Sequence, residues 1–358
     1  MSKESKKILL SGVKPTGRVH IGNYFGAMKQ FVDLQDEYDC YVFIADYHAM
    51  TTVQDKEKLS KGIIDVALDY LAIGLDPKKI TLFKQSDIPQ VAELTWIFNC
   101  LTTVPYLARA HAFKDAVSRA QKKHTESILE DIGKVDGVEV HTDLYDAMVV
   151  SNVNVGLFDY PILMAADILI QDADVVPVGQ DQKQHIEYAR DVAQKFNNAY
   201  GETFKLPEPF IVSEVETIVG TDGRKMSKSY GNVIPLFATD EEIKKAVMSI
   251  PTDSKGVAEP KNPDESNLYA IHKLFLDEEG RKNLREKYEK GGMGYKEAKE
   301  LLIKDMSDFI RPLREKREML AKDLDTVLDI LKVGGARVNT RVEKKMADVR
   351  KKVGVGIY

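Results

Sequence analysis

The chain has 358 residues, 43% of them hydrophobic and 30% charged, and a formal net charge of −5. Its length exceeds that of one typical domain and predicts two, and the absence of any run of about eighteen apolar residues argues against a transmembrane helix. Residues 1–7 are polar and lysine-rich, so we expect no signal peptide. Cys40 and Cys100 have no partner at metal-binding spacing, and we expect two reduced, buried thiols in a cytoplasmic protein.

Short apolar runs alternate with helical patterns over the first two-thirds of the chain. The predicted strands are Ile8–Leu10, Tyr41–Ala45, Thr81–Phe83 and Val175–Val178. The predicted helices are Gly22–Gln35, Lys56–Leu71, Gln90–Leu101, Pro161–Ile170 and Gln182–Asn197. Strands separated by helices imply parallel βαβ units and a doubly wound sheet of the α/β class. Ligands of such sheets bind at the carboxyl ends of the strands, so the loop 11–19 is the expected nucleotide position.

From about Pro235 onward the strand signal disappears. Helices are predicted at Asp240–Ser249, Asn267–Phe275, Tyr295–Ala321 and Leu324–Leu331, and a basic helix at Asn339–Val353 after a break at Gly334-Gly335. We therefore expect a Rossmann-like catalytic domain at 1–217 with a polar insertion at about 115–155. A loop and linker at 218–234 and a C-terminal α-helical domain at 235–358 complete the expected organisation.

Charge is distributed unevenly along the chain. Residues 281–358 contain 21 Lys and Arg against 13 Asp and Glu, although the whole chain is acidic. A basic tail on an acidic body can neutralise the phosphates of a nucleic acid. A solvated helical surface explains the same pattern, and charge alone does not decide between the two.

The first chemical motif, His20-Ile21-Gly22-Asn23, lies where the first strand turns into a helix. The preceding glycines have the spacing of a P-loop, but Arg18-Val19 replaces the required Lys-Ser/Thr, which excludes a Walker A site. Gly12 and Gly22 would still let the backbone approach a ligand. The amino end of the helix would offer free N–H groups to a phosphate, to which His20 and Asn23 add side-chain hydrogen bonds.

The second motif, Lys225-Met226-Ser227-Lys228-Ser229, is a basic loop after Asp222-Gly223. A flexible loop can bring two ammonium groups over a phosphate leaving group and withdraw afterwards. Taken in isolation, it is equally typical of an ordinary lysine-rich surface loop.

Five motifs in the same order resemble those of the tryptophanyl-tRNA synthetases, which are class I aminoacyl-tRNA synthetases. The resemblance runs from about Ile8 to Tyr230 and leaves out the insertion. Its motifs are Ser11–Gly17 with His20–Tyr24, Ile44–Ala49, Leu163–Leu169, Val176–His185, and Gly223-Arg224 with Lys225–Ser229.

The resemblance implies a fold, an activity and partners. The fold would be a Rossmann-like domain with a HIGH-type nucleotide motif. ATP, as its Mg²⁺ complex, would activate L-tryptophan to the adenylate with release of pyrophosphate, and tRNA(Trp) would then accept tryptophan at its 3′ end. Relatives imply a homodimer, and no tightly bound metal or organic cofactor is expected.

The same resemblance assigns roles to individual residues. Catalytic roles fall on His20, Asn23, Lys225, Ser227 and Lys228. ATP binding falls on Gly12, Lys14, Pro15, Thr16, Gly22, Asn23, Gly179, Gln180, Asp181, Ile218, Lys225, Met226, Ser227, Lys228 and Ser229. Tryptophan binding falls on Asp167, Met164, Tyr160, His48 and Gln182.

Asp167 carries the choice of amino acid. It lies in an otherwise apolar helix, and a buried carboxylate without a donor would be costly. The resemblance makes the donor an indole N–H; the residue itself allows a neighbouring protein group equally well. A phenol hydroxyl would also serve, so a tyrosyl-tRNA synthetase is the alternative within the class. A catalytically silent tryptophan- or RNA-binding regulator is the alternative outside it.

Two positions depart from the pattern of many relatives. Lys14 stands where many have Gln, and Ala116 stands where many have a second lysine beyond the one matching Lys114. We hypothesise that Lys14 supplies the positive charge that those relatives obtain from the other position.

Overall fold

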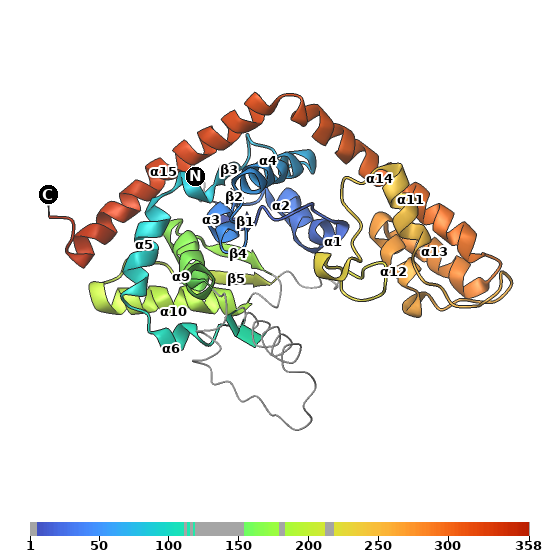
Figure 1. The fold of residues 1–358 in the computed structure, drawn as a ribbon, viewed down its shortest axis with the longest axis horizontal. Helices are drawn as coiled ribbons and strands as arrows, with labels where there is room; N and C mark the ends of the chain where they lie inside the picture. Colours follow the sequence, from blue (N-terminus) through green and yellow to red (C-terminus); the bar gives the residue numbers. More distant parts are fainter. Residues whose placement is uncertain are drawn as a thin grey trace, which may run out of the picture.

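A parallel sheet of five strands organises the first part of the chain. The computed structural model describes residues 6–110, 113–114, 117–118, 154–178, 183–211 and 218–357. The strand order is β3-β2-β1-β4-β5, and the strands are β1 (Ile8–Val13), β2 (Asp39–Ile44), β3 (Thr81–Lys84), β4 (Val175–Val178) and β5 (Glu208–Ile211). The chain proceeds outward from β1 to β3 and then returns to place β4 on the other side of β1 (Figure 1). This arrangement confirms the doubly wound sheet and puts its switch point between β1 and β4.

Helices connect the strands as the sequence predicts. They are α1 (Ile21–Asn23), the π-helix η1 (Tyr24–Met28), α2 (Lys29–Leu34), α3 (Asp46–Met50), α4 (Lys56–Ala72), the 3₁₀ turn η2 (Gln85–Asp87), α5 (Gln90–Asn99), α6 (Val104–Leu107), α9 (Val155–Ile170) and α10 (Lys183–Tyr200). The helix predicted at 22–35 is therefore one helical segment with a π-helical stretch in its middle. Nearly all of the predicted insertion at 115–155 lies outside the described residues.

The last third is helical, as predicted. Its elements are the 3₁₀ turns η4 (Lys228–Tyr230), η5 (Pro263–Glu265) and η6 (Lys273–Phe275), and the helices α11 (Asp240–Met248), α12 (Asn267–His272), α13 (Glu278–Lys290), α14 (Tyr295–Ala321) and α15 (Leu324–Val353). The long helices α14 and α15 meet at an apex, from which α15 runs back across the sheet domain (Figure 1). The described residues contain no helix that is both long and apolar enough to cross a membrane.

The predicted break at Gly334-Gly335 is wrong, because α15 is continuous from Leu324 to Val353. Both glycines are buried where the helix crosses the edge strand β3. A Cβ added at Gly334 would lie 1.9 Å from the carbonyl oxygen of Leu82 in β3, and one at Gly335 would lie 2.8 Å from Asp87. Gly334 therefore allows close approach to the backbone of β3 and Gly335 leaves room for the side chain of Asp87, and neither glycine ends the helix.

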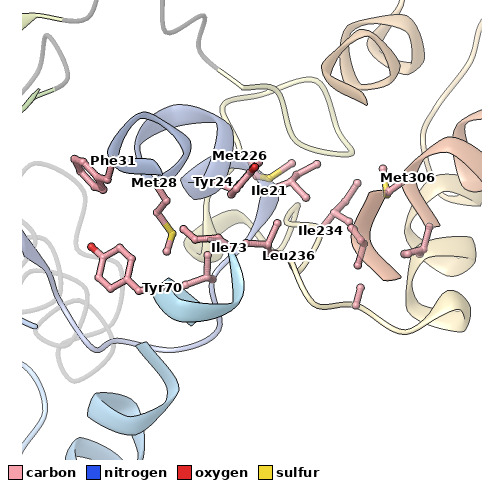
Figure 2. Close-up of a cluster of buried hydrophobic side chains, with 14 of the residues drawn as sticks. Ile21, Tyr24, Met28, Phe31, Tyr70, Ile73, Met226, Ile234, Leu236 and Met306 are labelled. Carbon is pink, nitrogen blue, oxygen red and sulfur yellow. The ribbon is translucent and has the colours of Figure 1, made fainter. Parts of the chain in front are cut away.

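Two buried clusters lie on the two faces of the sheet. Leu9 and Leu10, adjacent in β1, belong to different clusters, as the alternation of side chains along a strand requires. The first cluster continues from β1 and α4 into α11, α12 and α14, and in Figure 2 the side chains of Met226 and Ile234 extend it from the sheet domain toward α14. The second cluster takes in four residues of α15: Val338, Val342, Met346 and Val349.

Polar contacts also tie the helical part to the sheet domain. Arg317 of α14 donates to Asp69 at 2.5 Å and to Asp65 at 2.7 Å, both on α4. Arg18, in the loop after β1, pairs with Glu242 of α11 at 2.8 Å. The domain division at 217 and 235 stays a prediction, since the packing runs across it.

The expectation of two buried thiols is half wrong. Cys40 is buried in β2, whereas Cys100 is exposed. Cys100 follows the last turn of α5, where its amide caps the helix and its side chain faces outward.

Candidate active site

His20 begins the helix that follows β1. Its ring accepts, at Nδ1, the amide N–H of Asn23 at 3.3 Å, and the Asn23 side chain accepts the amide of His20 at 3.2 Å. This reciprocal pair is a capping box that fixes both side chains. Gly22 lies between them because a Cβ there would be 2.9 Å from the His20 ring and 3.2 Å from the sulfur of Met226.

The protonation state of His20 follows from these contacts. Burial, and then the charge of Lys228, lower the pKa of His20 to about 4, so the ring is neutral at pH 7. Because Nδ1 accepts a hydrogen bond, the single proton of the neutral ring resides on Nε2. His20 therefore offers one N–H donor that does not change with pH near neutrality.

The basic loop follows directly on a tight hairpin. That hairpin is closed by an antiparallel bridge between Val219 and Lys225, and the amide of Met226 donates to the carbonyl of Ile218 at 2.8 Å. Met226 is buried, while Lys225, Lys228 and Ser229 are exposed. The loop thus anchors on one apolar side chain and leaves its cations at the surface.

The first motif contacts the segment that follows the basic loop, and the basic loop itself reaches the nucleotide loop through Lys228. His20 forms an antiparallel bridge with Pro235, and the amide of Ile21 donates to the carbonyl of Ile234 at 3.0 Å. Lys228 donates to the carbonyl oxygen of Thr16 at 2.5 Å, although the two residues are 212 positions apart. The structure therefore brings the basic loop against the nucleotide loop at the carboxyl end of β1.

Asp167 is buried in α9 and has protein donors. Gln85, which follows β3, donates to both carboxylate oxygens at 3.0 and 2.8 Å, and His48 Nε2 lies 3.0 Å from Oδ2. The amide of His48 in turn donates to Gln85 at 3.2 Å. Burial raises the pKa of the Asp167 carboxyl, against the opposing effect of these hydrogen bonds. Gln85 follows β3 and His48 lies just beyond β2, so the sheet order brings both side chains to Asp167 on α9.

Tyr160 connects this group to the nucleotide loop. Its hydroxyl lies 2.7 Å from Nε2 of His185, and its ring packs edge-on against His48. The ammonium group of Lys14 lies 5.5 Å from the centre of the same ring. Burial of this group within the surrounding protein lowers the pKa of Lys14, although the residue retains exposed surface.

The remaining predicted residues divide into two sets. Pro15 is buried and Gly12 lies against the ring of Phe43, while Met164 is partly buried one turn before Asp167. The set outside the described residues is Gly179, Gln180, Asp181 and Gln182.

The sequence did not indicate three residues that organise the site. They are Gln85, His185 and Asn232, the last of which hydrogen-bonds within the basic loop. His185 stood inside a recognised motif, but its partner is 25 residues away and only the fold reveals the pair.

A five-stranded parallel sheet of this order, with the His20 segment and the Lys225–Ser229 loop joined at the end of β1, defines a class I aminoacyl-tRNA synthetase. The family model of tRNA synthetases class I (W and Y) matches residues 2–311. The chain belongs to this family.

Individual relatives agree over almost the whole length. The tryptophan–tRNA ligase of Fusobacterium nucleatum is 46% identical over 347 residues, covering 97% of both chains. That of Rhodopirellula baltica is 42% identical over 97% of this chain and 99% of the relative. The crystal structure of tryptophanyl-tRNA synthetase from Campylobacter jejuni complexed with ADP and tryptophan is 41% identical, with a TM-score of 0.83 over 97% of this chain and 99% of that one.

Proposed function

We propose that the chain is a tryptophan–tRNA ligase that forms tryptophanyl-adenylate from L-tryptophan and ATP and then transfers tryptophan to tRNA(Trp). The observation that carries this is the meeting of Lys228 with the nucleotide loop, in a chain whose near full-length relatives are tryptophan–tRNA ligases. The tyrosyl alternative loses support, because the relatives at 42 to 46% identity are tryptophan enzymes.

The first step needs alignment and charge stabilisation. The tryptophan carboxylate is already ionised and attacks the α-phosphate, so the P–O bond to pyrophosphate breaks without a protein nucleophile. The neutral His20 ring donates from Nε2 to a phosphate oxygen, and Lys225 and Lys228 neutralise the charge growing on pyrophosphate. Ser227 and Ser229, whose hydroxyls lie 2.8 Å apart, add neutral hydrogen bonds. Mg²⁺ enters with ATP, coordinated largely by phosphates and water.

Asp167 selects the indole. A carboxylate has about four acceptor positions, and three hydrogen bonds from Gln85 and His48 leave one for a further donor. The indole N–H fits that position as a single neutral donor. Tyr160, Met164, His48 and Gln182 complete the tryptophan-binding set, and Gly179, Gln180 and Asp181 contact ATP beside Gly12, Lys14 and Thr16.

The second substrate and the oligomeric state complete the proposal. The helical part binds tRNA(Trp), and the enzyme works as a homodimer in the cytoplasm. Trp96, the single tryptophan of the chain, is 71% exposed on α5, and large exposed aromatic side chains are typical anchors of interfaces. Light scattering should give twice the chain mass, and Trp96→Ala should give the mass of one chain.

Pyrophosphate exchange into ATP tests the activity. Exchange that depends on tryptophan supports the proposal, exchange that depends on tyrosine supports the tyrosyl alternative, and none with folded protein supports the silent regulator. Removal of Mg²⁺ by EDTA should abolish exchange.

A matched pair of variants tests the role of Asp167. Asp167→Asn should raise the tryptophan KM at least tenfold. Asp159→Asn is the control, because Asp159 lies on the same helix and its carboxyl pKa is also raised by burial, but its partner is Asn99. An equal effect of both variants on the tryptophan KM would contradict the assignment.

A further inference from the structure

Asn232 lies just beyond the basic loop and is only 3% exposed. Its side-chain oxygen accepts the amide N–H of Ser227 at 2.8 Å. Its side-chain nitrogen donates to the carbonyl of Lys225 at 3.1 Å and to the carboxylate of Asp222 at 2.7 Å. One amide group therefore holds the backbone on both sides of Met226.

The loop is built around this side chain. The backbone carbonyl of Asn232 accepts the amide N–H of Thr221 at 3.0 Å, so the residue is also bound to the hairpin that precedes the basic loop. A Cβ added at Gly220 would lie 2.3 Å from the Asn232 side-chain nitrogen, which explains the glycine at that position. The side-chain nitrogen faces two acceptors, in Asp222 and Lys225, and the side-chain oxygen faces one donor, the amide N–H of Ser227. The Asn232 amide can therefore satisfy all three partners in only one of its two flipped orientations.

Asp222 is the second member of this arrangement. One of its oxygens accepts from Asn232 and the other from Arg224 Nε at 2.7 Å. The pKa of Asp222 is lowered, first by the hydrogen bond from Asn232 and also by Arg224. The guanidinium of Arg224 lies 4.4 Å from the ring centre of Tyr230. Asp222 and Arg224, which precede the basic loop, are thereby linked to Asn232 and Tyr230, which follow it.

We propose that Asn232 is a positioning residue for adenylate formation, which fixes the loop backbone so that Lys225 and Lys228 reach the pyrophosphate, with Asp222 as its partner. The inference rests on the proposed function. It goes beyond that function because Asn232 touches no reacting group and acts only through the backbone of Lys225 and Ser227.

The isosteric variant Asn232→Asp tests the proposal. It keeps the acceptor for Ser227 but turns a carboxylate oxygen toward the carbonyl of Lys225 and the carboxylate of Asp222. A misplacement of about 1 Å can cost about a hundredfold in rate, so the kcat of tryptophan-dependent exchange should fall about 10- to 100-fold. The dissociation constant of tryptophan, measured by equilibrium dialysis, should stay within about twofold.

The double variant Asn232→Asp with Asp222→Asn restores an amide facing a carboxylate, with the two exchanged. Because it rebuilds the contact between positions 222 and 232 but not the hydrogen bond to the Lys225 carbonyl, its kcat should lie above that of Asn232→Asp and below that of the wild type. The control is Asn262→Asp, because Asn262 is an exposed asparagine whose oxygen accepts a backbone amide in the same way. That variant should leave kcat within about twofold of the wild type.

Hydrogen exchange provides a readout that does not need activity. Amides of 221–232 should exchange faster in Asn232→Ala than in the wild type, and most at Ser227, whose N–H loses its acceptor. Unchanged hydrogen exchange at these amides, or an Asn232→Asp variant with wild-type kcat, would overturn the inference. So would an equal loss of tryptophan binding, which indicates general unfolding. Absence of exchange into ATP by the wild type would instead overturn the proposed function.

Discussion

The ammonium group of Lys228 donates to the carbonyl oxygen of Thr16 at 2.5 Å and its charge also acts on the neighbouring His20. The contact joins two segments that are 212 residues apart, and it lies at the carboxyl end of β1, where the sheet topology places a ligand. The cation that belongs to the basic loop therefore adds to the effect of burial in lowering the pKa of His20 in the first motif.

This coupling predicts the pH dependence of stability. The pKa of His20 in the folded chain is about 4, below its ordinary value of 6.5, so the unfolded chain binds the proton more tightly. Stability contributed by the neutral ring is present above pH 6.5, is lost as the pH falls from 6.5 to about 4, and changes no further below that. The loss amounts to at most about 3.5 kcal/mol at ~1.4 kcal/mol per pKa unit.

Urea unfolding of the wild type and of His20→Gln between pH 7.5 and 4 measures this effect. The wild type should lose more stability than the variant over that range, and parallel curves would contradict the assignment. NMR titration of Lys228→Met should show a higher His20 pKa than in the wild type, although still below 6.5, because burial is the larger cause.

Gln85 should control tryptophan binding through Asp167. Gln85→Glu replaces the two donated hydrogen bonds with a carboxylate facing a carboxylate, which disfavours ionisation of the pair. We expect the tryptophan KM to rise at least about tenfold and the ATP KM to stay within about twofold. Gln90→Glu is the matched control, because Gln90 also donates to a carboxylate, that of Glu343, at 2.8 Å but at the contact with α15. Equal effects of both variants on the tryptophan KM would refute the role.

Lys14 should contribute charge to adenylate formation. Lys14→Ala and Lys14→Met should both reduce the rate of pyrophosphate exchange about 10-fold or more, since both remove the ammonium that lies over Tyr160. Lys14→Arg keeps the charge and should retain most of the rate. If exchange is unchanged in the alanine variant, Lys14 does not replace the cation that many relatives carry two residues beyond Lys114.

The site was predictable from sequence only where chemistry resides in contiguous motifs. The His20 segment, the basic loop and Asp167 all lie in contiguous sequence motifs that can be recognised without a structure. Gln85 does not, because its meaning depends on the strand order that brings it to Asp167, 82 positions away. Asn232 follows its motif closely, yet its role depends on the hairpin that folds back over it.

The fold shows the same division. The first four strands follow from apolar runs, whereas β5 (Glu208–Ile211) was missed because Pro207 and Pro209 interrupt its pattern and it is recognisable only by pairing with β4. Part of the positive charge of α15 likewise has a role inside the fold: Arg341 donates to the carbonyl of Gln171, and Lys345 pairs with Asp172 at 2.7 Å.

Three exposed cations of α15 should bind tRNA. Arg337, Lys344 and Lys351 are exposed and recur every seven residues, which places them about 10 Å apart along one face of the helix. Fluorescence anisotropy with tRNA(Trp) across a NaCl series should show a salt slope smaller by about 0.7–0.9 for each contact removed in Lys344→Met and Lys351→Met. Lys78→Met is the control, because Lys78 is exposed at the amino end of β3, the edge opposite the site. Slopes unchanged from the wild type in the first two variants would exclude this face.

Close packing of α15 on the sheet should make Gly334 irreplaceable. Alanine normally stabilises a helix interior by about 1 kcal/mol relative to glycine. Here its Cβ would lie 1.9 Å from the backbone oxygen of Leu82, and neither backbone can yield without moving the helix off β3. Gly334→Ala should therefore lower the melting temperature by at least about 4 °C. Val333→Ala, at an exposed neighbour, should change it by less than about 2 °C.

The same displacement should reach the tryptophan site. Asn339 of α15 donates to the carbonyl of Asp87 at 3.1 Å, and Asp87 ends the 3₁₀ turn that begins with Gln85. Moving α15 therefore disturbs the residue that holds Asp167, and Gly334→Ala should raise the tryptophan KM while the ATP KM, set at the end of β1, changes little. Steady-state exchange kinetics at a temperature well below the melting transition measure both constants. Equal increases in the two would show that the helix supports the whole sheet and has no particular link to the tryptophan-binding residues.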